Sequence, residues 1–164
     1  MKIAALLPNF EKDAFWEAPI RGIQEAIVAK HHFSIDVKYF YFEENKLQRF
    51  EEVTQEILAT PPDALLLAPI FKKEAQIFLQ SLTEKEIPFI LINTQLPSVN
   101  SICYIGQDSY QSGQLAARLI STRQAKNGTY LLLHLEQEEN TINATHIYQK
   151  EAGFFDYFTI LPQT

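Results

Sequence analysis

The chain has 164 residues, of which 46% are hydrophobic and 21% charged, and its formal net charge is −6 with a pI near 5.2. This length suffices for one large domain, or for one domain and part of another. The acidic balance argues against the chain binding nucleic acid by itself, because phosphate binding needs a basic surface. The single cysteine, Cys103, excludes an internal disulfide and gives no sign of a cysteine-based metal site.

No stretch of the sequence predicts a membrane span or a signal peptide. The longest apolar runs cover residues 64–70 and 88–92, far fewer than the roughly 20 residues that cross a bilayer. We therefore expect a cytoplasmic protein without a membrane partner.

The first part of the sequence alternates between predicted strands and helices. Residues 2–7 form an apolar run, which is typical of a strand. Apolar residues then recur at helical spacing over residues 16–30. Residues 33–42 alternate in hydrophobicity and are rich in β-branched and aromatic side chains, so we expect a strand at an edge of the sheet. A second amphipathic helix begins near residue 47 and ends before two consecutive prolines.

Residues 63–93 predict one βαβ unit, around which the rest of the sequence is organised. Residues 64–68 and 88–92 are apolar runs typical of parallel strands that are covered on both faces. Between them, apolar residues at i, i+3, i+4 and i+7 predict a helix over residues 72–86. Ligands of open parallel sheets bind outside the carboxyl ends of the strands, so the polar residues after each strand are where function should be sought.

The remaining sequence predicts fewer strands. Residues 102–105 predict a short fifth strand, and Asp108 opens a capping box at the start of a helix whose small-residue face includes Gly113. Residues 129–133 predict a further strand, residues 141–157 predict a last helix, and residues 160–161 are expected to begin another strand. The whole pattern predicts an α/β protein with a doubly wound, mainly parallel sheet in three αβα layers. We expect a first domain over residues 1–107 and the beginning of a second, similar domain over residues 108–164.

Several kinds of catalytic and cofactor site are not expected. The turn after the first strand, residues 8–12, contains no glycine, which argues against a dinucleotide site. A phosphorelay receiver needs acidic residues after the first and third strands, where this sequence has proline followed by asparagine or isoleucine. There is no G-x-S-x-G motif, and the four histidines share no ligand spacing. We predict no catalytic residue, no metal and no cofactor.

Aromatic and hydrogen-bonding side chains follow several of the predicted strands. Asn9 ends the first strand, Asn93 the fourth and Asp108 the fifth, while Phe15 and Trp16 begin the first helix. A sugar ring has an apolar face that an aromatic ring can cover, and hydroxyls that amides and carboxylates can bind. Two simpler explanations stay open, because Trp16 also fits the apolar stripe of its helix and Asp108 is also a helix cap.

The order and spacing of five segments resemble the effector-binding core of the Lac repressor family, which shares its fold with type I periplasmic sugar-binding proteins. The segments are residues 14–23, 63–69, 87–93, 104–117 and 150–154. The resemblance extends over essentially the whole chain. It implies that Phe15 and Trp16 stack on a sugar, and that Asn93 stands where the family often has an aspartate that binds sugar hydroxyls.

Two further positions are implied by the resemblance. Asp108 matches the helix start that enters the second lobe. Lys150 stands where the family usually has an arginine, so that a bidentate clamp is lost. The implied ligand-binding set is Asn9, Phe15, Trp16, Asn93, Asp108 and Lys150.

The resemblance implies a non-enzymatic domain whose two lobes close around a small carbohydrate effector, and which pairs as a homodimer. DNA would be bound only through a helix-turn-helix domain that this sequence does not contain. Only about 55 residues follow Asp108, whereas a lobe needs roughly 100–150. We therefore expect a fragment that binds sugar weakly.

Two other functions stay open. A periplasmic sugar carrier, or the sensor domain of a membrane kinase, would have the same fold. A signal peptide upstream would favour the carrier, and an upstream helix-turn-helix would favour the regulator. An enzyme of flavodoxin-like topology is a third possibility, for which the sequence offers no catalytic group.

Overall fold

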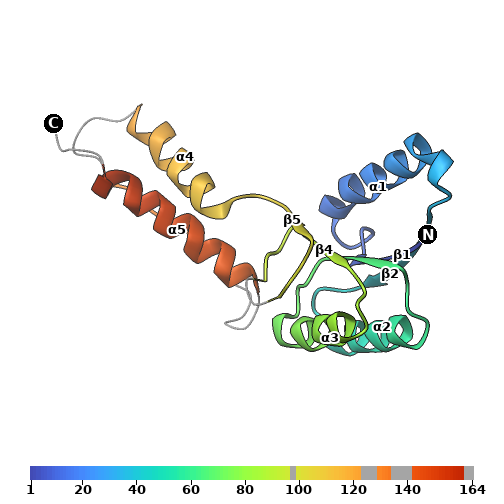
Figure 1. The fold of residues 1–164 in the computed structure, drawn as a ribbon. Coiled ribbons are helices and arrows are strands. Elements are labelled where there is room, and N and C mark those ends of the chain that lie inside the picture. The colour runs from blue at the N-terminus through green and yellow to red at the C-terminus, as the bar shows by residue number, and fades with distance from the viewer. Residues whose placement is uncertain (97–98, 123–128, 134–141, 161–164) are drawn as a thin grey trace. The chain divides into compact units, whose positions relative to one another are not determined.

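The computed structural model describes residues 1–96, 99–122, 129–133 and 142–160 (Figure 1). The chain divides into two compact units, Met1–Gly106 and Gln107–Thr164, which we call unit 1 and unit 2. Among the described residues, no helix is long and apolar enough to span a membrane.

Unit 1 is built on a five-stranded parallel sheet. Its strands are β1 (Lys2–Pro8), β2 (Asp36–Phe42), β3 (Ala64–Leu67), β4 (Phe89–Ile92) and β5 (Cys103–Ile105). They lie in the order β2-β1-β3-β4-β5, and all four neighbouring pairs are parallel. The predicted α/β fold with a doubly wound parallel sheet is confirmed, as is the place of β2 at an edge.

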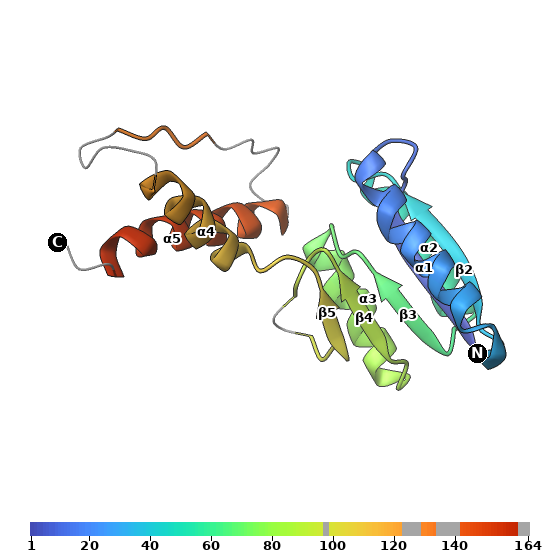
Figure 2. The ribbon, with the colours of Figure 1, turned by 90° about the horizontal axis from the view of Figure 1, so that it is seen from above.

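Helices cover both faces of this sheet. The three crossover helices are α1 (Glu17–Ala29), α2 (Leu47–Ala59) and α3 (Lys72–Glu84). Helices α2 and α3 lie side by side on one face, and α1 lies on the other (Figures 1 and 2). Short 3-10 turns at Ala14–Trp16 and His31–Phe33 lead into and out of α1. The three predicted crossover helices are confirmed.

Strand β2 begins later than its sequence pattern predicts. The alternation predicts extended backbone over residues 33–35, but the His31–Phe33 turn ends at Ser34, which has a φ of 49° in the left-handed region. Phe33 and Ile35 continue the alternating pattern of β2. Aromatic and β-branched residues favour strands, but they do not exclude a turn at this position. The strand therefore starts at Asp36.

Successive residues of each strand face opposite sides of the sheet, and the side that faces α2 and α3 is buried more completely than the side that faces α1. Side chains toward α2 and α3, such as Leu6, Leu67 and Leu91, are completely buried. On the α1 face, Leu7 is buried against the helix, whereas Ile92 is only partly buried. The core of unit 1 is therefore concentrated between the sheet and the pair formed by α2 and α3.

Unit 2 contains two helices packed closely together, α4 (Ser109–Ser121) and α5 (Ile142–Ile160). A side chain at Gly113 would collide with the carbonyl oxygen of Lys150, and one at Gly153 would collide with that of Tyr110. The Tyr110 hydroxyl also donates a hydrogen bond to Asp156 over 2.7 Å. The small-residue face predicted for α4 includes Gly113, and it is here that α5 approaches closely.

Two strand predictions in this part of the sequence are wrong. Residues 129–133 are described but have no regular structure, and Leu131 and Leu133 are 83% and 79% exposed. A strand needs a hydrogen-bonded neighbour, and the described part of unit 2 contains only helices. Ile160 is the last residue of α5 rather than the start of a strand. Residues 141 and 161, to which the predictions for the last helix and strand extend, lie outside the described residues.

Candidate ligand-binding site

The carboxyl edge of the sheet in unit 1 carries Asn9 and Asn93. Asn9 directly follows β1 and Asn93 directly follows β4, and β3 lies between these two parallel strands. The N–H of Asn9 donates to the carbonyl of Phe42 over 2.8 Å, and the N–H of Asn93 donates to that of Ile105 over 2.8 Å. Two of the predicted site residues are thus brought to one edge of the sheet.

The side chain of Asn9 shapes the loop that leads to the aromatic residues. Its Oδ1 accepts a hydrogen bond from the N–H of Glu11 over 3.0 Å, as in an Asx-turn. The Oδ1 of Asp13 then accepts from the N–H of Phe15 over 3.0 Å and caps the first 3-10 turn. These two side chains explain why the chain bends at the carboxyl edge and presents Phe15 there.

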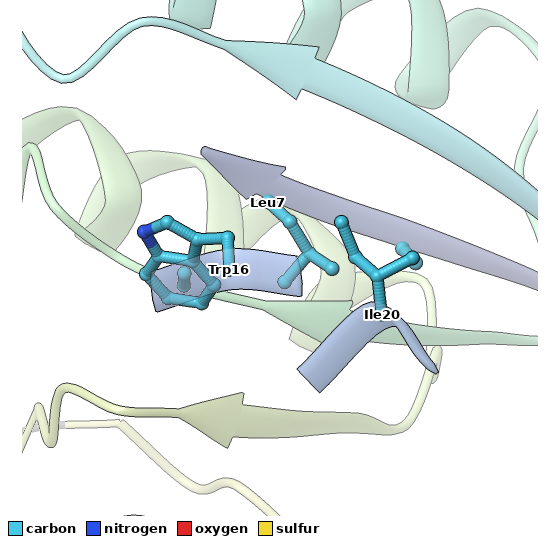
Figure 3. Close-up of a cluster of buried hydrophobic side chains, with 5 residues drawn as sticks. Leu7, Trp16 and Ile20 are labelled. Carbon is cyan, nitrogen blue, oxygen red and sulfur yellow. The ribbon is translucent and has the colours of Figure 1, made fainter. Parts of the chain in front are cut away.

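The two aromatic residues at this turn have different environments. Phe15 is 54% exposed, whereas Trp16 is 1% exposed. Their rings meet edge to face, with centroids 5.2 Å apart and planes at 85°. Trp16 packs on the α1 face of the sheet with Leu7 and Ile20 (Figure 3). Of these two rings, that of Phe15 is exposed, whereas Trp16 is part of the core.

Glu44 is a residue of this edge that sequence reasoning missed. The indole Nε1 of Trp16 donates a hydrogen bond to Glu44 Oε1 over 3.3 Å. Loss of water around the carboxylate raises the pKa of Glu44; the Trp16 hydrogen bond opposes this rise, and the charge of Asp13 adds to it. The sequence shows only an acidic turn after an edge strand, and no signal in it links Glu44 to Trp16.

Asn93 lies in a sharp turn at the end of β4. Its φ is 63°, in the left-handed region that asparagine adopts more readily than most residues. The N–H of Thr94 donates to the carbonyl of Ile92 over 2.7 Å, and the hydroxyl of Tyr104 donates to the carbonyl of Asn93 over 3.1 Å. Thr94 is completely buried, whereas Asn93 is partly exposed at the edge. An asparagine at this position therefore has a conformational explanation as well as its predicted ligand role.

Asp108 and Lys150 belong to unit 2. Asp108 Oδ1 accepts the N–H of Gln111 over 2.9 Å, so the predicted helix cap is confirmed. Lys150 lies on α5, where it lines a cavity of about 360 Å³ that is mostly apolar and includes Gly113 and Phe154. The start of α4 contacts α5 at His146, about one turn before Lys150, through the hydroxyl of Ser109.

The described residues offer no evident metal site. Within them, no three histidine, cysteine, aspartate or glutamate side chains gather closely enough to hold an ion. The residues that follow the strands at this edge of unit 1 include the exposed ring of Phe15, the amides of Asn9 and Asn93 and the carboxylate of Glu44. Such groups can cover an apolar surface and bind hydroxyl groups.

Residues 3–162 match the model of the periplasmic binding protein domain family. The chain belongs to this family. A search of curated proteins found no match. The family match agrees with the order of the strands in the sheet. It supports the resemblance to the periplasmic binding protein fold that the sequence shows.

Solved structures share the fold of this periplasmic binding protein domain. A candidate LacI transcriptional regulator from Bacteroides fragilis is 25% identical, with a TM-score of 0.80 over 96% of this chain and 54% of that chain. A periplasmic ribose ABC transporter protein from Conexibacter woesei is 17% identical, with a TM-score of 0.83 over 96% of this chain and 50% of that one. GanP, a glucose-galactose binding protein from Geobacillus stearothermophilus, is 19% identical, with a TM-score of 0.72 over 98% and 55%. The chain spans about half the length of these structures.

Proposed function

We propose that the chain is the ligand-sensing part of a Lac-repressor-type transcription regulator and binds a small carbohydrate effector. The observation that carries this proposal is the exposed ring of Phe15 in the turn after β1, in a binding-protein family domain whose sheet also carries Asn9 and Asn93 at its carboxyl edge. The 25% identity to a candidate LacI regulator supports the regulator over other members of the family.

The proposed chemistry assigns different roles to the edge residues. Phe15 covers the apolar face of the sugar ring, and the amides of Asn9 and Asn93 bind its hydroxyls, because an amide both donates and accepts hydrogen bonds. Trp16 holds Phe15 edge to face and does not itself stack, since its ring is buried. Asp108 and Lys150 lie in unit 2, which we take to be the beginning of the second lobe, and their roles as ligand contacts stay predictions.

The proposed signal is a shift between two arrangements of the lobes. A ligand that binds one arrangement more tightly moves the equilibrium toward it. We propose that the protein works in the cytoplasm as a homodimer and without enzymatic activity. Its DNA contacts would come from a helix-turn-helix domain that this sequence does not contain.

Backbone NMR during a sugar titration tests the proposal. Because the chain spans about half of its solved relatives, we expect affinities in the millimolar range for D-ribose, D-glucose or D-galactose. The expected result is a saturable shift of the amide signals of Asn9, Phe15 and Asn93.

The exposed rings of the chain supply a matched control for this titration. Phe15→Ala should abolish the shifts. Phe33→Ala should leave them unchanged, because Phe33 is 61% exposed but precedes the amino end of β2. Equal losses in both variants, or no saturable shift in the unaltered chain, would remove the proposed function.

A periplasmic sugar carrier is the second candidate. Two of the structures with the same fold are a ribose transporter protein and a glucose-galactose binding protein. The two candidates share the ligand chemistry but differ in what precedes the domain. Sequencing the gene upstream distinguishes them, because a carrier has a signal peptide and a regulator has a helix-turn-helix domain.

A further inference from the structure

The turn at Asn93 is held in place by hydrogen bonds at both of its main-chain polar groups. Its φ of 63° lies in the left-handed region, which costs a residue with a side chain some free energy, although asparagine tolerates it better than most, and contacts around Asn93 stabilise it. The N–H of Asn93 donates to the Ile105 carbonyl over 2.8 Å, and its carbonyl accepts from the Tyr104 hydroxyl over 3.1 Å. Both partners belong to β5, which pairs with β4 in the sheet.

Gly106 makes room for the Tyr104 side chain. A Cβ atom at Gly106 would collide with the hydroxyl oxygen and the Cζ atom of Tyr104. The phenol ring therefore turns back over the main chain that follows its own strand, and this brings its hydroxyl to Asn93. A glycine at this position is needed for the close approach rather than for a left-handed φ, because no glycine of the described residues has a positive φ.

The turn directs two neighbouring residues to different environments. Thr94 is completely buried, and its main-chain N–H is bonded to the Ile92 carbonyl over 2.7 Å. Asn93 stays partly exposed at the carboxyl edge. If the φ of Asn93 relaxed to a negative value, its amide would leave the edge in another direction.

We propose that Tyr104, seated over Gly106, is a positioning residue that fixes the direction of the Asn93 amide. The pair thereby determines which hydroxyls of a bound sugar this amide reaches. The specificity part of this inference rests on the proposed function, since it takes Asn93 to be a ligand contact. The positioning part rests only on the contacts of β4 and β5.

Amide hydrogen exchange measured by NMR without sugar tests the positioning part. Tyr104→Phe removes the hydroxyl and keeps the ring, so the amides of Asn93 and Thr94 should exchange roughly fivefold faster, the effect of losing one hydrogen bond. Tyr39→Phe is the matched control, because the Tyr39 hydroxyl has no hydrogen-bond partner among the described residues. It should leave both amides unchanged.

A glycine at position 93 separates positioning from general stability. Glycine adopts the left-handed conformation without strain, so adding Tyr104→Phe to Asn93→Gly should change the exchange of Thr94 less than Tyr104→Phe alone does. Unchanged exchange at Asn93 and Thr94 in Tyr104→Phe would overturn the inference. Equal effects of Tyr104→Phe in both backgrounds would also overturn it, because the hydroxyl would then act on the sheet as a whole.

A sugar titration of the same variants tests the specificity part. Tyr104→Phe should change the ratio of affinities for D-glucose and D-galactose, whereas Tyr39→Phe should leave this ratio unchanged. Binding with an unchanged ratio would contradict the specificity part and leave the proposed function standing. Absence of binding in the unaltered chain would instead defeat the proposed function, and with it the specificity part.

Discussion

The two units bury their apolar residues to very different extents. In unit 1, large side chains such as Leu6, Phe50 and Leu79 are completely buried. In unit 2, Leu119 and Leu131 are 61% and 83% exposed, although their sequence segments are just as apolar. Unit 1 supplies each strand with a neighbour, and its helices cover the buried residues of the central strands β1, β3 and β4. An apolar segment therefore becomes part of a core only where other elements pack against it.

The largest expected effect is at the core of unit 1. Leu79→Ala should lower the free energy of unfolding by about 2–5 kcal/mol, because it leaves a cavity in a packed region. Ile77→Ala, in the same helix but 69% exposed, is the matched control and should change it by less than about 0.5 kcal/mol. Urea unfolding followed by the fluorescence of Trp16, the single tryptophan, measures unit 1. Similar losses in the two variants would contradict the complete burial of Leu79.

A smaller effect is expected at the helix pair of unit 2. Gly113→Ala should destabilise the packing of α4 and α5 by about 1–3 kcal/mol, because the new methyl group would collide with the Lys150 carbonyl. Hydrogen exchange followed by mass spectrometry should show faster exchange in peptides from both helices.

Another helical glycine provides the control. A methyl group added at Gly22 of α1 would meet no other residue within 4 Å, so Gly22→Ala should stabilise its helix by about 0.5–1 kcal/mol. If Gly113→Ala proved equally favourable, the close contact between α4 and α5 would be refuted.

A pH-dependent effect is expected at Glu44. Its pKa in the folded chain is raised above the ordinary value of 4.5, so the protonated carboxyl favours folding. This contribution is complete below pH 4.5 and is lost as the pH rises through the raised pKa. Unfolding free energies measured over this range should fall with pH more in the unaltered chain than in Glu44→Gln.

An exposed carboxylate serves as the control for this titration. Glu25→Gln changes an acid whose side chain is 74% exposed on α1, and should keep the decrease that belongs to Glu44. A Glu44→Gln curve that parallels the unaltered chain would show that the carboxylate is not desolvated beside Trp16.

The smallest effect is expected at the exposed leucines of unit 2. Leu131→Lys should change the hydrogen exchange of α4 and α5 very little, corresponding to less than about 0.5 kcal/mol, because the side chain is 83% exposed. A large increase in exchange would indicate that Leu131 is buried, and the contrast between the two units would then be lost.

The elements of unit 1 could be predicted because their patterns are satisfied within the unit. Helix α3 lies between β3 and β4 in the sequence. Its apolar stripe is buried, and the two strands pair with each other. Residues 129–133 show the same apolar pattern but have no strand beside them among the described residues. A hydrophobic pattern indicates whether a segment can form a strand. Whether the strand forms depends on another segment that pairs with it.

The residues of the candidate site were only partly predictable. Strand ends and helix starts point to Asn9, Asn93 and Phe15, since topology places such positions at one edge. Sequence leaves open whether Trp16 is buried or exposed, because an aromatic residue at helical spacing suits both environments. Contacts such as that between Tyr104 and Asn93 depend on side-chain directions in neighbouring strands, and no local spacing encodes them.

The central claim is that a sugar lies against Phe15 at the carboxyl edge of unit 1. Intermolecular nuclear Overhauser effects between sugar ring protons and aromatic protons test it most directly. We expect contacts from the sugar to the Phe15 ring and to the side-chain amide of Asn93, with none to the indole of Trp16. Contacts only to aromatic residues elsewhere, such as Phe33 before the amino end of β2, would contradict it.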